Sequence, residues 1–288
     1  MKKVLLATSA LVMFAGAASA EIALSGSAVM GVGDDGGVDG VRSIMETYLT
    51  FSASGETDAG LAFGFDTTIG VYDTDGGLND DGTSVYISGA FGKLSMGSVA
   101  EADEVATLSD IGLVGLGIDN VAESYSGDSA GRESHDVNYT YSAGALMLAL
   151  SAHIGAGGEG DGYAVGVKYS FGDAYVGLGY NDDNVSLAAG TVTSVYAGGS
   201  FGAFGVSAMW SEWNPDAAGA NQDAYGVYMT YAVDALTLSA AVADGSAEAD
   251  ASYGIGAAYD LGGGAEVKGG VGDVRGETVW DMGLSFSF

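Results

Sequence analysis

The C-terminal end of the chain alternates strictly between apolar residues and small or acidic ones. A period of two residues is typical of a β-strand, whose neighbouring side chains point to opposite faces, and does not fit a helix. An apolar face that runs to the last residue is not stable loose in water, so we predict a docked strand in apolar surroundings. Its apolar positions are Trp280, Met282, Leu284, Phe286 and Phe288.

Similar alternation recurs along the chain, in sixteen segments that begin at Ile22. The connections alternate as well, because short turns such as Phe171-Gly172-Asp173 are followed by longer acidic stretches such as residues 181–190. Short turns at one rim and long loops at the other are typical of transmembrane β-barrels, whose strands place apolar residues outward and polar residues inward.

The sheet must be closed, because this pattern places its apolar face in membrane lipid. Lipid offers no hydrogen-bond partner to backbone groups, so a sheet with an open edge is excluded from the membrane. Sixteen strands leave room for an aqueous channel, whereas eight would be filled by side chains. We therefore predict an all-β fold, a closed antiparallel transmembrane barrel of 16 strands around a pore.

The N-terminal end indicates export. Two lysines precede an apolar run of about 12 residues, and Ala18-Ser19-Ala20 then supplies the small residues that signal peptidase accepts. The run is shorter than the roughly 20 residues that a membrane-spanning helix needs. We predict that residues 1–20 are a cleaved signal for Sec export and that residues 21–288 form a single barrel domain.

The charge balance excludes several classes of partner. The chain has eight Lys and Arg against 38 Asp and Glu, a formal net charge of −30. A nucleic-acid surface needs clustered bases, so nucleic acid is excluded as a partner. The chain has no cysteine, so an exported fold must be held without disulfides.

Several stretches, in order along the predicted mature chain, resemble a known family. Together they are similar to the general diffusion porins of Gram-negative outer membranes, and most of all to the sixteen-stranded trimeric porins of alphaproteobacteria. The stretches are EIALSG at 21–26, GETDAGL at 55–61, DGTSVYISGAFGKLSMG at 81–97, YTYSAG at 139–144, YDLGGG at 259–264 and the terminal Phe288.

The resemblance implies a function and a set of partners. Such a porin is a homotrimer in outer-membrane lipid and lipopolysaccharide, placed there by the outer-membrane assembly machinery, for which Phe288 would be the C-terminal signal. It would pass small hydrophilic solutes and ions by passive diffusion, without a cofactor. The alternatives are a substrate-specific porin with an aromatic track and a structural or adhesive barrel without a pore.

The resemblance also implies that the third long loop turns inward and narrows the pore. In this chain that loop runs from about residue 99 to residue 134 and has one base, Arg132. Its apolar segment 111–118 indicates packing against the barrel wall, whereas the alternative is an external loop. The acids that we expect at the constriction are Glu101, Asp103, Glu104, Asp110, Asp119 and Glu123.

Porins of this family set bases on the wall opposite the loop, and this chain departs from that pattern. The matching inward positions hold Val29, Glu46, Tyr48 and Thr68. Such an excess of carboxylates concentrates cations in a narrow pore and repels anions, so we predict cation selectivity. The candidate side chains of the pore wall are Arg42, Glu46, Tyr48, Asp66, Lys168 and Lys268.

Acidic pairs in the long connections allow a second interpretation, a calcium site. Carboxylates between glycines suit Ca²⁺, although no EF-hand spacing is present and no particular residues can be chosen. Zinc is improbable, because the chain has no Cys and only two His. We otherwise expect these acids to form a solvated external face; they include Asp34, Asp35, Asp80, Asp81, Asp182 and Asp183.

A catalytic barrel is the remaining alternative. His135 and Asp136 would be its candidates, but no nucleophile motif accompanies them, so we expect a solvated rim histidine and no enzyme. Aromatics beside the short turns indicate the interfacial girdle of a barrel. They are Tyr141, Phe171, Phe201, Tyr231 and Tyr259.

Overall fold

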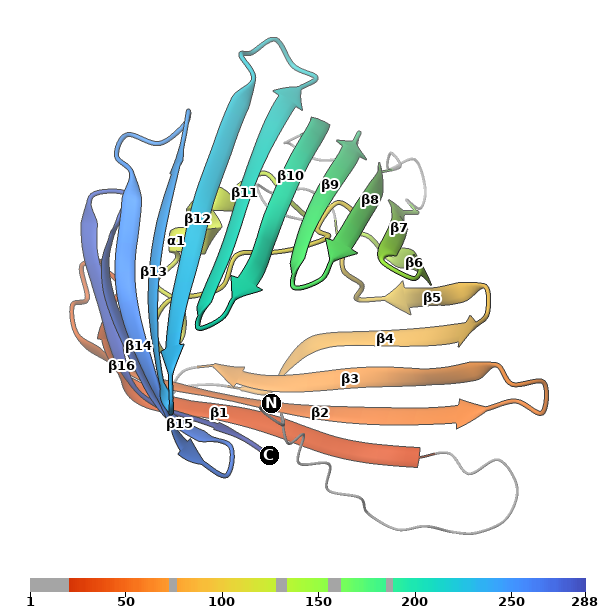
Figure 1. The fold of residues 1–288 in the computed structure, drawn as a ribbon, viewed down its shortest axis with the longest axis horizontal. Coiled ribbons are helices and arrows are strands. Elements are labelled where there is room, and N and C mark those ends of the chain that lie inside the picture. The colour runs from red at the N-terminus through yellow and green to blue at the C-terminus, as the bar shows by residue number, and fades with distance from the viewer. Residues whose placement is uncertain (1–20, 73–76, 128–133, 155–161, 185–188) are drawn as a thin grey trace.

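A computed structural model describes residues 21–72, 77–127, 134–154, 162–184 and 189–288. The predicted export signal and Arg132 lie outside the described residues. The chain forms one closed antiparallel barrel in which each strand pairs with its neighbours in sequence and β1 closes on β16 (Figure 1). This confirms the predicted sixteen-stranded fold.

The strands are 6 to 15 residues long. Thirteen of them have 10 or more residues and so reach the 9 to 11 that a tilted strand needs to cross the membrane. Their bounds are β1 (Glu21–Asp34), β2 (Arg42–Glu56), β3 (Ala62–Tyr72), β4 (Asn79–Gly89), β5 (Gly92–Gly97), β6 (Val137–Ala143), β7 (Leu146–His153), β8 (Gly162–Phe171), β9 (Ala174–Asp183), β10 (Gly190–Phe201), β11 (Phe204–Pro215), β12 (Gln222–Val233), β13 (Leu236–Gly245), β14 (Ser252–Gly262), β15 (Ala265–Val274) and β16 (Glu277–Ser287).

The C-terminal strand closes the barrel, as its apolar face predicted. The register of β1 with β16 runs from Ser27 opposite Ser287 to Asp34 opposite Trp280. The last residue is held too, because Gly26 N donates to Phe288 O at 2.8 Å and Phe288 N donates to Gly26 O at 3.0 Å. The closing seam therefore leaves no open edge at the C-terminus.

The apolar face of the strands points outward. Ile22, Leu178 and Ile255 are 68%, 59% and 63% exposed in the isolated chain, and their register partners share that face. Such an outward apolar surface is suited to contact with membrane lipid. The predicted girdle aromatics belong to it, since all five are more than a third exposed.

The connections differ between the two rims, as the sequence predicted. Two-residue turns at one rim need a left-handed backbone, which Gly172 and Gly202 supply with φ of +65° and +66°. The longer connections lie at the other rim. The longest of them contains α1 (Ile118–Ala122), a helix of five residues. No helix in the described ranges is long and apolar enough to cross a membrane.

Candidate functional site

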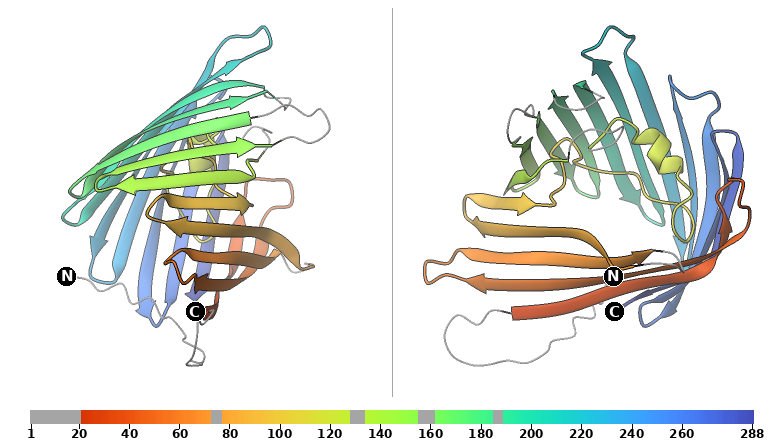
Figure 2. Two further views of the ribbon diagram at one scale, coloured as in Figure 1. Left: turned by 90° about the vertical axis from the view of Figure 1, so that its right-hand side faces the viewer. Right: turned by 180° about the vertical axis from the view of Figure 1, so that it is seen from behind.

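The connection after β5 crosses the interior of the barrel, where Figure 2 shows it as the yellow segment with α1. We call its described residues 98–127 the inner loop. The inward positions beneath it are glycines, and a Cβ at Gly166 would overlap the Ala102 carbonyl oxygen. A Cβ at Gly226 would lie 2.5 Å from Ala122 Cβ. The loop backbone thus fits against a wall without side chains, whose other glycines include Gly31, Gly177, Gly179, Gly254, Gly256, Gly270 and Gly283.

Apolar side chains of the inner loop fill the space that these glycines leave. Val121 and Ile118 are 0% and 2% exposed, and they form one buried cluster with Tyr196, Met209 and Ala243 of the wall. Burial of such side chains contributes about 1.5–3 kcal/mol each. The loop is therefore part of the hydrophobic core; its other buried members in this cluster are Val105, Leu108, Ile111 and Ala122.

A buried carboxylate ties the middle of the inner loop to β16. Asp281 is 4% exposed and accepts hydrogen bonds from Leu113 N at 2.7 Å and Val114 N at 3.0 Å. Gly112 precedes these two donors with φ of +95°, and a Cβ there would overlap the Asp281 carboxylate. Two successive backbone amides that donate to one carboxylate form a charge-assisted anchor. Any residue other than glycine at position 112 would disrupt this anchor.

Removal of this anchor should destabilise the folded barrel. Asp281→Ala leaves the buried Leu113 amide and the partly buried Val114 amide without an acceptor, at about 1–3 kcal/mol for a buried group. We expect the folded form to convert to the unfolded form at a lower temperature in heat-modifiability gels. Ser285→Ala, on the same inward face of β16, is the matched control; equal conversion temperatures for the two variants would contradict the anchor.

The first two of the predicted constriction acids lie against the wall. Glu101 and Asp103 are 5% and 0% exposed. Asn181 Nδ2 of β9 donates to Glu101 Oε2 at 2.6 Å and to Asp103 Oδ1 at 3.2 Å, and Gly127 N donates to Asp103 Oδ2 at 3.2 Å. These carboxylates hold the two ends of the inner loop together and to β9.

The other predicted acids are less buried and gather around α1. Asp110 is exposed, Asp119 and Glu104 are half-buried, and Glu123 accepts a hydrogen bond from Leu108 N at 2.6 Å. Although Asp110 as a whole is exposed, its carboxyl lies against the inner loop at Gly115, and this desolvation, with the nearby Asp119 carboxylate, raises the pKa of Asp110 to about 6. Desolvation, with several carboxylates around it, raises the pKa of Glu123 to about 7, although the Leu108 amide opposes the shift.

The wall opposite the inner loop is formed by β2 to β5 and is rich in hydroxyl groups. Thr50 Oγ1 lies 2.9 Å from Thr68 Oγ1, and Ser52 donates to Asp66 Oδ1 at 2.6 Å. Tyr48 donates to Glu46 Oε2 at 3.1 Å. The predicted wall positions Glu46, Tyr48 and Asp66 share this inward face through the β2–β3 register, and so does Thr68.

The bases of the described ranges lie beside acids or aromatic rings. Arg42 pairs with Asp35 at 3.1 Å and Lys268 with Glu266 at 3.2 Å. Lys168 lies over the ring of Tyr175. The sequence analysis missed two bases, although the first could have been found, because it alternates with the outward apolar residues of β5 and so lies on the inward face. They are Lys93, which lies 4.4 Å from the centroid of the Tyr86 ring, and Arg275, which pairs with Glu248 at 2.8 Å.

The family model described as Gram-negative porin matches residues 7–278. The chain belongs to this family. A curated porin from Rhodobacter capsulatus is 32% identical over 211 residues, which cover 68% of this chain and 69% of that protein. The resemblance stated from sequence is thereby confirmed. The family consists of passive channels, so the catalytic alternative is dismissed.

Solved porin structures have the same fold as this porin. One, refined at 1.8 Å resolution, is 29% identical, with a TM-score of 0.73 and coverage of 93% of this chain and 100% of that one. A variant of Rh. blastica porin is 25% identical, with a TM-score of 0.76 and the same coverage. The family places this porin in the outer membrane.

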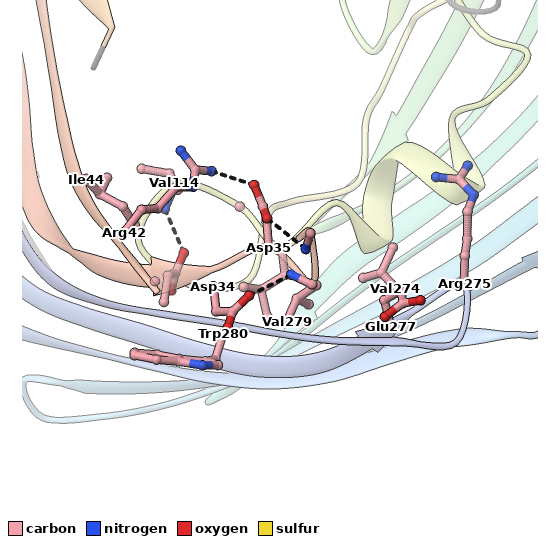
Figure 3. Close-up of a pocket in the computed structure, with 16 residues that line it drawn as sticks. Asp34, Asp35, Arg42, Ile44, Val114, Val274, Arg275, Glu277, Val279 and Trp280 are labelled. Carbon is pink, nitrogen blue, oxygen red and sulfur yellow. Dashed lines mark hydrogen bonds and ion pairs between the residues drawn. The ribbon is translucent and has the colours of Figure 1, made fainter. Parts of the chain in front are cut away.

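A pocket of about 360 Å³ lies at the rim of this porin with the longer connections (Figure 3). Arg42 and Asp35 lie on one side of it and Arg275 on the other. Ile44, Val114 and Val279 are among its apolar lining residues. The positive charge of Arg42 at this pocket is thus paired with the negative charge of Asp35.

His135 and Asp183 are buried, although we predicted that both are exposed to solvent at the rim. His135 is only 3% exposed and is hydrogen-bonded inside the protein. Its Nδ1 lies 2.6 Å from Ser151 Oγ, which also accepts a hydrogen bond from Ala102 N at 2.8 Å. Burial lowers the pKa of His135. Asp183 is 3% exposed, because β9 extends to this residue on its inward face. Both predictions of solvent exposure were wrong.

The structure offers no support for a particular metal site. In the part of the chain that the structure describes, no group of three or more His, Asp or Glu side chains is arranged to hold a metal ion. Ca²⁺ at the acidic connections therefore has no residues to assign, and we propose none.

Proposed function

We propose that this porin is a trimeric, water-filled channel through which small hydrophilic solutes diffuse passively and which favours cations over anions. The observation that carries the proposal is the imbalance of charge across the lumen. The inner loop contributes Asp110, Asp119 and Glu123, while the opposite wall has hydroxyls and carboxylates at the positions where bases were expected.

The physical argument is electrostatic. A narrow aqueous passage through a low-dielectric wall focuses the field of its charges, so uncompensated carboxylates raise the local cation concentration. Three of the five bases in the described ranges are paired with an acid, which weakens their opposing field, while Lys93 and Lys168 lie over aromatic rings and keep their charge. Attraction of cations is screened by salt and should be strongest at low ionic strength.

Partners follow from the same proposal. The outward apolar surface is suited to membrane lipid and, at the rim, to lipopolysaccharide, and the Phe288 backbone pairing with Gly26 supports a closing role for the C-terminus that the outer-membrane assembly machinery would recognise. Residues 1–20 would direct Sec export and be removed. A trimer is supported by the family relationship.

The test is a planar-bilayer recording of the mature protein under a KCl gradient. We expect a reversal potential of the sign that cation permeation gives, with conductance that appears in groups of three. A reversal potential of zero or of opposite sign would overturn cation selectivity, and absence of conductance would favour the structural barrel. Heat-modifiable migration with a retained trimer band checks the assembly.

A further inference from the structure

Two tyrosines form a corner on the wall opposite the inner loop. Tyr48 of β2 and Tyr72 of β3 have ring centroids 5.4 Å apart and an interplanar angle of 67°. Each hydroxyl donates to a carboxylate, Tyr48 to Glu46 at 3.1 Å and Tyr72 to Asp81. Glu46 is also the register partner of Tyr72, so the two rings and Glu46 share one inward patch.

The Tyr72 ring lies along the wall. A Cβ at Gly70, the register partner of Tyr48, would lie 2.8 Å from the Tyr72 hydroxyl oxygen and 2.9 Å from Tyr72 Cζ. The Tyr72 ring therefore lies against the backbone at Gly70, and because Tyr72 is an inward residue that is only half-buried, part of its surface is exposed to the lumen. Tyr48 and Tyr72 are both half-buried.

Two other inward tyrosines show how such rings are used in this barrel. Lys93 Nζ lies 4.4 Å from the Tyr86 ring centroid, and Lys168 Nζ lies 5.6 Å from that of Tyr175. Both distances are within the range of a cation–π contact. Among the residues that the structure describes, no lysine or arginine lies over Tyr48 or Tyr72.

We propose that Tyr48, Tyr72, Glu46 and Asp81 form a binding site for organic ammonium cations, above all quaternary ammonium compounds, on their way through the pore. The site rests on the proposed cation selectivity and names the class of solute that benefits from it. A quaternary ammonium group is bulky and presents apolar methyl groups, so it can contact two rings at once.

The carboxylates make the site cation-specific. A phenol that donates to a carboxylate has a more electron-rich ring, and the negative charges of Glu46 and Asp81 attract a cation directly. A neutral sugar could stack on the same rings but gains nothing from these charges. The combination of rings and acids therefore favours an organic cation over a sugar.

The experiment measures block of the K⁺ current by choline chloride in single-channel recordings of the whole mature porin. We expect half-block at a choline concentration at which glucose has no comparable effect. Tyr48→Leu and Tyr72→Leu should each raise the half-blocking concentration about two- to fivefold, the loss expected for one exposed cation–π contact. Tyr48→Phe keeps the ring and should stay within about twofold of the wild type.

Tyr86→Leu is the matched control, because it removes an inward tyrosine of the same wall whose ring Lys93 already covers. Unchanged choline block in Tyr48→Leu and Tyr72→Leu would overturn the site, and so would equal block by glucose. The KCl reversal potential of the wild type separates the two proposals. A cation-selective pore without choline block contradicts this inference alone, whereas a pore without cation selectivity contradicts the proposed function.

Discussion

Gly166→Ala is expected to destabilise the folded barrel by about 1–3 kcal/mol and to lower its conductance. The added Cβ would overlap the Ala102 carbonyl oxygen, and Val105 Cγ1 lies close on the same side. Backbone atoms cannot rotate away as the end of a side chain can. The inner loop must therefore leave the wall, and the cost is that of an overpacked core.

The direction of the conductance change follows from the anchors. Asp281 holds the loop at Leu113 and Val114, and Asn181 holds it at Glu101 and Asp103. A loop held at both places is pushed toward β2–β5 and narrows the passage. Single-channel conductance and the gel conversion temperature are the two measurements.

Gly205→Ala supplies the control for that experiment. Gly205 is also inward, on β11, but its Cβ would meet only Thr230 Oγ1 at 2.5 Å, the end of a side chain that can rotate. We expect near wild-type stability and conductance. If Gly166→Ala behaves like Gly205→Ala, the glycine-lined wall is not what seats the inner loop.

The strands could be predicted because their pattern is local. Alternation along ten residues is enough to define a strand and its two faces, and the seam between β1 and β16 follows from the need to close. The same parity placed Glu46, Tyr48 and Asp66 on the inward face of neighbouring strands, where the register puts them.

The path of the inner loop could not be predicted in the same way, because it depends on contacts between distant residues. Nothing in the sequence distinguishes Gly177 and Gly179 from other strand glycines, yet a Cβ at Gly177 would meet Val105 and a Cβ at Gly179 would meet Asp103. Asp103 and Asp110 look alike in the sequence, but one is fully buried and the other exposed. Only the wall that the loop meets distinguishes them.

Cation selectivity is expected to fall by about threefold or more between pH 8 and pH 5. Asp110 has a pKa of about 6 and Glu123 of about 7, both raised mainly by desolvation. Both carboxylates are ionised at pH 8 and protonated at pH 5. The inner loop therefore loses two negative charges across this range, while carboxylates with ordinary values near 4 stay charged.

Acidification could reduce selectivity either by removing charge or by releasing the inner loop from the wall. The raised pKa values distinguish the two, because they set how docking of the loop depends on pH. Because both folded-state values lie above the ordinary ones, the docked loop binds more protons than the released loop between about pH 4 and 7. Its docking is therefore strongest below about pH 4 and weakens as the pH rises from there to about 7. Acidification should reduce selectivity while the loop stays in place.

The variants test whether these two groups are responsible. Asp110→Asn with Glu123→Gln should give at pH 8 the weaker selectivity that the wild type has at pH 5, and should flatten the dependence on pH. Asp39→Asn, in the exposed connection between β1 and β2, removes a charge remote from the loop and should keep the pH dependence. A double variant that retained the wild-type pH profile would place the selective charge elsewhere, and Glu46 with Asp66 on the opposite wall would be the next pair to neutralise.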